Sequence, residues 1–369
     1  MYVIVRRGYA WPVPTTIPAR FIFLGTGTSG GIPLIACDCL TCSSPDPRDR
    51  RTRTGAALQW IDPAGLPRCV LIDATPDLRE QALRHGLWRV DAIFFTHNHV
   101  DHIFGLDEVR RFNAVMREPI SIYAEAYVLD SLRRVYRHVF DPGSNVNDSF
   151  VATLIAHEVP PPPEDPWSAA DPIILWGMRF TPIRLMHGRL PVLGWRIEPD
   201  QRSRAGEQAP VQNKTDARSL MPDAQFLPLA YCTDVSSIPP YSWPRFDGLR
   251  TLALDALRHR KHPTHFTLDQ AIDVATQIDA HHTYFIHIAH ELGHEATEAA
   301  LHERQRLAHD GLVLGSLGGA GERAFADDRA RLAAALAGRD KGPHRPQPHA
   351  PDNPEPSSGP EREGSFHEP

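Results

Sequence analysis

The chain has 369 residues, of which 41% are hydrophobic and 23% charged, the proportions of an ordinary soluble globular protein with a substantial core. A formal net charge of −6 gives no overall attraction for nucleic acid, and no apolar run approaches the ~20 residues of a membrane span. Five cysteines, an odd number in a long chain, do not indicate a disulfide framework. We therefore expect a cytoplasmic protein with no membrane partner, and we rank nucleic acid low as a partner.

Short apolar segments that predict strands recur along the chain, each bounded by turn residues or helix starts. They cover residues 21–24, 69–72, 92–95, 120–123, 178–185, 229–232, 251–254 and 283–288. Helical patterns fall between some of them, at 77–85, 103–113 and 268–278, with Thr267 as a cap for the last. The sequence therefore predicts a mixed α/β fold.

Segments rich in proline, glycine and polar residues divide the chain. Residues 1–19 predict an irregular N-terminal leader, and residues 141–171 and 199–224 predict surface insertions. From residue 323, a short helix at 329–336 precedes a tail that we expect to be mostly disordered. Its histidines are expected to be solvated rather than bound to metal, namely His344, His349 and His367. We therefore expect a single domain, 20–322, with loop insertions.

The densest cluster of metal-binding side chains is the run His97-Asn98-His99-Val100-Asp101-His102, which follows an apolar strand and precedes a helix. Three imidazoles and a carboxylate are ligands that zinc, manganese and iron accept. Because one ion could not readily use all four with further ligands, the spacing suggests two adjacent ions. His97 and His99 would bind one, and Asp101 and His102 the other. A chance cluster of polar loop residues is the alternative.

Three other strand ends each offer one more ligand, which a two-metal centre needs. His187 follows the strand 178–185, Asp234 follows the strand 229–232, and His287 lies within 283–288. A single histidine is more often a packed or surface residue, so these residues become candidates only in combination with the first motif.

Together, residues 97–102 followed by His187, Asp234 and His287 resemble the seven-ligand pattern of the metallo-β-lactamase superfamily, over residues 21–314. The resemblance implies an αββα sandwich with the site at one edge, between the two sheets. It implies that one ion is held by His97, His99 and His187, that the other is held by Asp101, His102 and His287, and that Asp234 bridges them. Asp73 matches the family's early aspartate that supports the ligands from behind, and a plain turn or helix cap is its alternative role.

A second metal site is indicated by Cys37, Cys39 and Cys42, three thiols on one loop that need one more ligand for a tetrahedral structural Zn²⁺. His290, three residues after His287, is the candidate for that ligand. This loop and histidine resemble those of the phosphoribosyl cyclic phosphodiesterases of phosphonate breakdown, a branch of the superfamily. The alternative is free buried thiols, the state expected for Cys69 and Cys232 within strands.

His265 lies in the run His-Pro-Thr-His at 262–265, where the same phosphodiesterases have a histidine that is not a metal ligand. Proton donation helps to expel an alkoxide from a phosphodiester, and histidine titrates near neutrality. We therefore expect His265 to be the general acid. His259 and His262 are nearby competitors, and an exposed histidine beside a helix is the alternative. The glycine-rich turn 25–31 borders the site by the same resemblance.

The resemblance implies a metal-dependent phosphodiesterase that hydrolyses a small phosphodiester, cyclic esters included, through a metal-bridging hydroxide. In this scheme Asp101 and Asp234 set the metal geometry, and His265 protonates the leaving oxygen. The cofactors expected are two divalent ions, Mn²⁺ or Zn²⁺, in the active site and one structural Zn²⁺. The partner expected is the small-molecule phosphodiester substrate, and a homodimer stays open.

Three other functions stay open from the sequence. A ribonuclease Z-like tRNA-processing nuclease belongs to the same superfamily, although we find no extended basic region to bind tRNA. The same centre serves a lactone or thioester hydrolase, with a carbonyl in place of phosphorus. A non-catalytic accessory protein like the B protein of pyrroloquinoline quinone biosynthesis shares the cysteine loop. That relative often departs from the standard ligand set, which is complete in this sequence.

Overall fold

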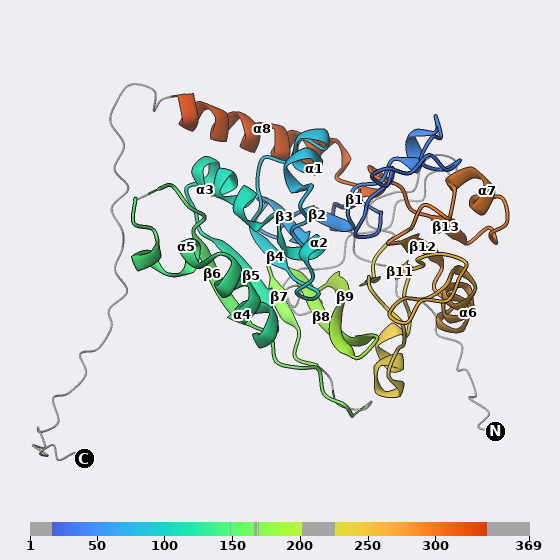
Figure 1. Ribbon diagram of the computed structural model, residues 1–369. Coiled ribbons are helices and arrows are strands. Elements are labelled where there is room, and N and C mark those ends of the chain that lie inside the picture. Colours follow the sequence, from blue (N-terminus) through green and yellow to red (C-terminus); the bar gives the residue numbers. More distant parts are fainter. Residues whose placement is uncertain (1–16, 148, 166–167, 169, 201–225, 338–369) are drawn as a thin grey trace, which may run out of the picture.

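The computed structural model describes residues 17–147, 149–165, 168, 170–200 and 226–337 (Figure 1). Within these residues, two seven-stranded sheets lie at the centre and helices cover their outer faces. The expected αββα sandwich in a single domain is therefore confirmed. Most of the expected leader, the insertion beyond residue 200, and the tail beyond residue 337 with its three histidines lie outside the described residues.

The first sheet has the strand order β14-β1-β2-β3-β4-β5-β6. Its strands are β1 (Ala19–Gly25), β2 (Gly55–Ile61), β3 (Pro67–Ile72), β4 (Ala92–Phe94), β5 (Ile120–Ala124), β6 (Leu154–Glu158) and β14 (Val313–Ser316). Strands β3 to β6 are parallel to one another. Their carboxyl ends therefore meet at one edge of the sheet, where Asp73 and His97 follow β3 and β4.

The second sheet has the strand order β13-β12-β11-β10-β9-β8-β7. Its strands are β7 (Ile173–Leu175), β8 (Met178–His187), β9 (Leu190–Pro199), β10 (Leu229–Cys232), β11 (Thr251–Asp255), β12 (His282–Ile286) and β13 (Gln305–Leu307). Strands β10 to β13 are parallel. Their shared carboxyl edge places Asp234, Asp255 and His287 next to one another.

Helices on the first sheet's outer face are α1 (Leu78–Arg84), α3 (Arg110–Met116), α4 (Ala126–Val135) and α8 (Gly318–Ala337), and α6 (Leu268–Ile278) covers the second sheet. Short helical segments are η1 (Pro47–Asp49), α2 (Val100–Ile103), η2 (Leu106–Val109), α5 (Arg137–Phe140), η3 (Pro142–Ser144), η5 (Pro240–Phe246) and α7 (His294–Glu298). Across the described residues, we find no helix with both the length and the apolar character needed to cross a membrane.

Aromatic side chains fill the space between the two sheets. The ring of Phe94 on β4 stacks on Phe180 of β8 with centroids 4.3 Å apart, and it meets Trp195 of β9 edge-on at 4.8 Å. All three side chains are fully buried, so each removes a large apolar area from water. This contact joins the sheets directly below the loop that follows β4.

The predicted helix at 103–113 is wrong as a single element. The chain forms α2, η2 and α3 instead, with the interruption at Gly105. Its backbone N–H donates to Ala74 O at 2.8 Å rather than to a carbonyl within the helix. A Cβ atom at Gly105 would lie 1.9 Å from Thr75 O, so only glycine allows this close approach.

The predicted surface insertion at 141–171 is also wrong in part, because β6 lies inside it and extends the first sheet parallel to β5. Its side chains are largely exposed, as an edge strand allows, so the sequence shows no buried pattern there. Helix α8 begins before the expected segment 329–336 and crosses the expected domain boundary at residue 322. Its Leu332 is buried against the first sheet's outer face.

Candidate metal centre

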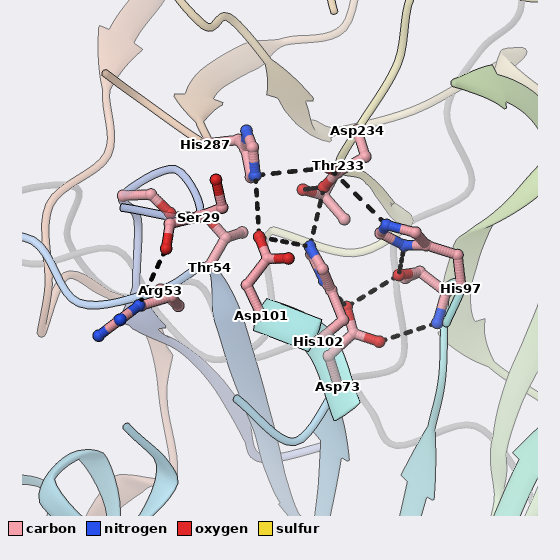
Figure 2. A network of polar contacts seen from close by, with 12 residues as sticks. Ser29, Arg53, Thr54, Asp73, His97, Asp101, His102, Thr233, Asp234 and His287 are labelled. Carbon is pink, nitrogen blue, oxygen red and sulfur yellow. Dashed lines mark hydrogen bonds and ion pairs between the residues drawn. The ribbon is translucent and has the colours of Figure 1, made fainter. Parts of the chain in front are cut away.

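The seven predicted metal ligands lie together at the edge where the carboxyl ends of the parallel strands meet. Figure 2 shows side chains from the loop and helix after β4 facing Asp234 and His287 from the second sheet. They form two groups, His97, His99, His187 and Asp234 in one and Asp101, His102 and His287 in the other. Within each group the ligand atoms lie within 4.8 Å of one another. This division matches the one that the family resemblance implied.

Asp234 lies between the two groups. Its Oδ1 atom is 3.8 Å from His97 Nε2 and 3.4 Å from His287 Nε2, and its Oδ2 atom is 3.1 Å from His102 Nε2. One carboxylate therefore faces imidazoles of both groups, which is the position that a bridging ligand requires.

Hydrogen bonds behind the histidines orient their rings. His102 Nδ1 donates to Asp73 Oδ2 at 2.7 Å, and His187 Nδ1 donates to Thr264 O at 2.6 Å. The Thr96 hydroxyl donates to Asp73 Oδ2 at 2.9 Å and accepts from His97 Nδ1 at 2.9 Å. Because each Nδ1 carries the proton, the opposite nitrogen keeps its lone pair for the centre. Asp73 therefore lies behind His102, and behind His97 through the Thr96 hydroxyl.

The donor atoms at the centre fit divalent cations. The Nε2 atoms of His97, His102 and His287 are buried and have no hydrogen-bond partner among the described residues. An unpaired buried nitrogen costs free energy, and such groups are rare without a ligand or an ion. Imidazole nitrogen together with carboxylate oxygen suits Zn²⁺ and Mn²⁺.

Electrostatics at the centre keep its carboxylates ionised. Burial raises the pKa of Asp234, but His287, His102 and His97 outweigh it and hold that pKa well below its usual range. Burial, followed by the neighbouring His102, holds the pKa of His97 well below its usual value. Burial lowers the pKa of His287, but the carboxylates of Asp234 and Asp101 raise it to about 9. The buried carboxylates thus carry the negative charge that a divalent cation neutralises.

Three site residues adopt left-handed backbone conformations that non-glycine residues seldom occupy. The φ angles are 64° for Asp73, 56° for Asp234 and 59° for His287. Asp73 and His287 follow a strand directly and Asp234 follows one residue later, so a sharp turn aims each side chain into the edge instead of continuing the strand. Hydrogen bonds hold these turns, such as Ile288 N to Thr26 O at 2.9 Å.

His265 lies at the border of the same centre. Its ring stacks on His287 with centroids 4.7 Å apart, and its Nε2 atom is 4.0 Å from Asp234 Oδ1. Its Nδ1 atom donates to Asp255 Oδ2 at 2.8 Å. The ligand atoms of Asp234, His265 and His287 also lie within 4.8 Å of one another, so proximity alone allows His265 as a ligand. Of its competitors, His262 is beside it, with ring centroids 5.1 Å apart.

Sequence reasoning did not identify Asp255, the carboxylate behind His265. It is fully buried, and its Oδ2 atom also accepts the backbone N–H of Val235 at 2.7 Å. Its Oδ1 atom has no hydrogen-bond partner among the described residues and lies 4.0 Å from His287 Nδ1. The only signal in the sequence was its place at a strand's carboxyl end, the same as for Asp234.

The second predicted metal site is also assembled. The Sγ atoms of Cys37, Cys39 and Cys42 lie 3.2, 3.4 and 3.6 Å from Nδ1 of His290. The backbone N–H of Cys42 heads the interactions that lower the pKa of Cys39 to about 6, which favours its thiolate, whereas burial heads those that raise the pKa of Cys42 to about 11. Three thiols and one imidazole fit a tetrahedral Zn²⁺. Cys69 and Cys232 are fully buried in strands, as expected.

Several known proteins are similar to this chain. Residues 68–288 match the family described as "Beta-lactamase superfamily domain". The crystal structure of a new diphosphatase from the PhnP family is 37% identical, with a TM-score of 0.65, and the match covers 81% of this chain and 98% of the diphosphatase.

Two curated relatives match over part of their length. An octanoyltransferase of Porphyromonas gingivalis is 35% identical over 272 residues, which are 73% of this chain and 46% of the relative. Coenzyme PQQ synthesis protein B of Methylobacterium nodulans is 34% identical over 131 residues, which are 32% of this chain and 41% of the relative. The chain thus spans less than half the length of these two relatives.

Proposed function

Because the chain belongs to the metallo-β-lactamase superfamily and has its hydrolase fold, we propose that it is a two-metal phosphodiesterase acting on a small phosphodiester, cyclic esters included. The observation that carries this proposal is the hydrogen-bonded pair of His265 and Asp255 at the edge of the metal centre. A proton donor at this position can protonate the oxygen that leaves phosphorus.

The hydrogen bond between the two side chains gives the His265 ring a fixed orientation at the metal centre. Asp255 is fully buried, and its carboxylate accepts Nδ1–H of His265, which fixes the plane of the ring. This leaves Nε2 as the atom that would donate a proton to the leaving group, and it faces Asp234 Oδ1 at 4.0 Å. Such a donor matters most for an ester whose alcohol is a poor leaving group, because an alkoxide cannot depart without a proton.

The remaining residues hold the reaction centre in place. The seven ligands would hold divalent cations, which would supply Lewis acidity to the phosphoryl oxygens and lower the pKa of water. Asp73 and Thr96 fix the rings of His97 and His102 through Nδ1. A hydroxide derived from water forms a bond to phosphorus while the bond to the leaving oxygen breaks, and His265 gives its Nε2 proton to that leaving oxygen. A phosphate monoester and an alcohol result.

The similarity to the diphosphatase supports phosphorus as the atom attacked. A diphosphate and a phosphodiester both lose an oxygen-bound group from phosphorus, so one arrangement of ligands and acid serves both. The octanoyltransferase match makes acyl substrates a necessary comparison in any assay. The same ligand set polarises a carbonyl.

The direct test is a substrate screen with purified protein and added Mn²⁺. We would measure kcat/KM for bis-p-nitrophenyl phosphate, a cyclic ribose phosphate, a diphosphate, a lactone and a thioester. The proposal expects the phosphodiesters to exceed the lactone and the thioester by about 100-fold or more. A clear preference for the lactone or thioester would contradict it. About one tightly bound zinc with no exchangeable pair would support the accessory protein instead.

A further inference from the structure

The three histidines of the first metal group are not supported equally from behind. Hydrogen bonds at Nδ1 hold the rings of His97 and His187. The ring of His99 is exposed and makes no hydrogen bond within the described part of the chain. The position of His99 therefore depends on how the backbone around it is held.

Helix α4 holds the backbone beside His99. Asn98, the preceding residue, donates its side-chain amide to Ser131 Oγ on α4 at 2.9 Å. Ser131 is buried, and its hydroxyl donates to Tyr127 O, one helical turn earlier, at 3.0 Å. Because the hydroxyl proton is committed to Tyr127, the oxygen is left to accept from Asn98. The segment that carries His99 is thereby attached to a fixed point on α4.

The same end of α4 holds the hairpin that carries His187. The Tyr127 hydroxyl donates to Pro191 O on β9 at 2.8 Å, four residues after His187. Glu125, the N-cap residue of α4, pairs with Arg184 of β8, three residues before His187, at 2.8 and 2.5 Å. Both side chains of this pair are buried, and its two parallel hydrogen bonds fix its geometry. Helix α4 is therefore attached to the hairpin on both sides of His187.

This helix thus connects two metal ligands that lie far apart in the sequence. The rings of His99 and His187 have centroids 5.0 Å apart, and both residues belong to one metal group. Metal–ligand distances vary by only about 0.2 Å, so a shift of either segment changes the fit of the ion. The second group is held differently, because Tyr136 beyond the end of α4 donates to Ile103 O on α2 at 2.9 Å.

We propose that Asn98 and Tyr127 are positioning residues that set the spacing of His99 and His187 through α4, and with it the affinity of the first metal site. Neither residue is a metal ligand. The inference rests on the metal centre of the proposed function and not on the identity of the substrate. A residue that orients a metal ligand contributes about 10- to 100-fold in metal affinity.

The test titrates Co²⁺ into protein whose active site is free of metal and follows the visible absorption of the bound ion. We expect Asn98→Ala and Tyr127→Phe each to weaken the first site by about 10-fold, and the double variant to weaken it further. Ser131→Ala should match Asn98→Ala, and combining these two should add nothing, because both remove one hydrogen bond. Tyr136→Phe is the matched control, which should leave the first site unchanged.

Occupancy at each site distinguishes positioning from a general loss of structure. Anomalous scattering from crystals soaked in limiting Co²⁺ should show occupancy falling at His97, His99 and His187 in Asn98→Ala, and not at the second group. The Glu125–Arg184 pair stays intact in every variant, since removing one partner would leave a buried charge unpaired.

The same measurements separate this inference from the proposed function. An equal loss of affinity at both sites, or a loss at neither, would overturn the positioning role even where diesters are hydrolysed. If the first site alone is weakened but no diester is hydrolysed by wild type, the positioning role stands and the phosphodiesterase function fails.

Discussion

The Nδ1 atom of His102 donates a 2.7 Å hydrogen bond to Oδ2 of Asp73, and both side chains are fully buried. The same carboxylate oxygen accepts the Thr96 hydroxyl, which in turn contacts His97. One aspartate outside the ligand set thus orients a histidine in each metal group. This dependence can be tested without removing any ligand.

We expect Asp73→Asn to weaken binding of the active-site metals by about 10- to 100-fold, with a matching loss of turnover. Asparagine tolerates the left-handed backbone at this position, so the substitution removes charge and acceptor capacity with little strain. Chelator competition followed by metal analysis measures the effect. Asp77→Asn is the control, because Asp77 pairs with Arg53 and contacts no ligand. Unchanged metal affinity would show that Asp73 acts only as a turn residue.

His265→Ala should keep both active-site metals and lose turnover, most strongly for diesters with poor leaving groups. The measurement is kcat across aryl diesters of graded leaving-group pKa, together with metal content. The dependence on leaving-group pKa should become steeper in the variant. Asp255→Asn should also make the dependence of kcat on leaving-group pKa steeper, but by a smaller amount. In this variant the acid remains but loses its orienting carboxylate.

His262→Ala is the control for the His265 experiment, since His262 lies beside it without a contact to Asp255. If His262→Ala has a stronger effect than His265→Ala, the assignment of His265 as the general acid is wrong. A fall in metal content in His265→Ala would make His265 a ligand together with Asp234 and His287, an arrangement that proximity also allows.

The metal ligands could be predicted because four of them lie within six residues of one segment. Such a dense cluster of metal-binding side chains can be recognised without a structure. His187, Asp234 and His287 needed a known pattern to connect them, since each is a single polar residue at a strand end. Asp255 has the same local appearance, yet no motif indicated it. Its role depends on the parallel neighbours β10 and β12, which bring Val235 and His287 to its two oxygens.

Several elements of the fold were not predicted, among them β2 and β9, whose side chains are mostly buried, and two of the errors have a clear structural reason. The edge strand β6 has an exposed pattern, and the predicted helix 103–113 is interrupted by the contact of Gly105 with Thr75, a residue far from it in the sequence. By contrast, α6 was predicted at its true bounds, because Thr267 and Gln270 form a local capping box. Elements that depend on local sequence signals could be predicted, and features that depend on contacts between distant segments could not.

Cys42→Ser should remove the structural zinc but not the two active-site metals, which are counted separately. Serine is a poor zinc ligand, and a structural zinc contributes folding free energy directly, so we expect the melting temperature to fall by about 5–10 °C. Ser43→Ala is the control in the same loop, where the hydroxyl only donates to Asp38 O. Metal analysis and thermal unfolding measure the two effects. Full zinc content in Cys42→Ser would contradict the four-ligand site.

His294 makes folding stability depend on pH. Its Nδ1 atom accepts a hydrogen bond from Nη2 of the buried Arg51 at 2.9 Å, and its backbone N–H donates to Asp49 Oδ1 at 2.7 Å. Burial, followed by the charge of Arg51, lowers the pKa of His294 to about 4. In the unfolded chain the pKa is about 6.5. Between these values the unfolded state binds the additional proton, so the stability is complete above about pH 6.5 and is lost as pH falls towards 4.

We expect this residue to account for about 3 kcal/mol of the free energy of unfolding that is lost between pH 7 and pH 4. His294→Gln supplies an acceptor for Arg51 that does not titrate, so its stability should fall less steeply over the same range. The measurement is the difference in urea unfolding free energy between the two proteins at several pH values. Taking the difference removes the shared contribution of the metal ligands, which titrate in both. If the unfolding free energy depends on pH equally steeply in both proteins, His294 does not contribute to the pH dependence of folding stability.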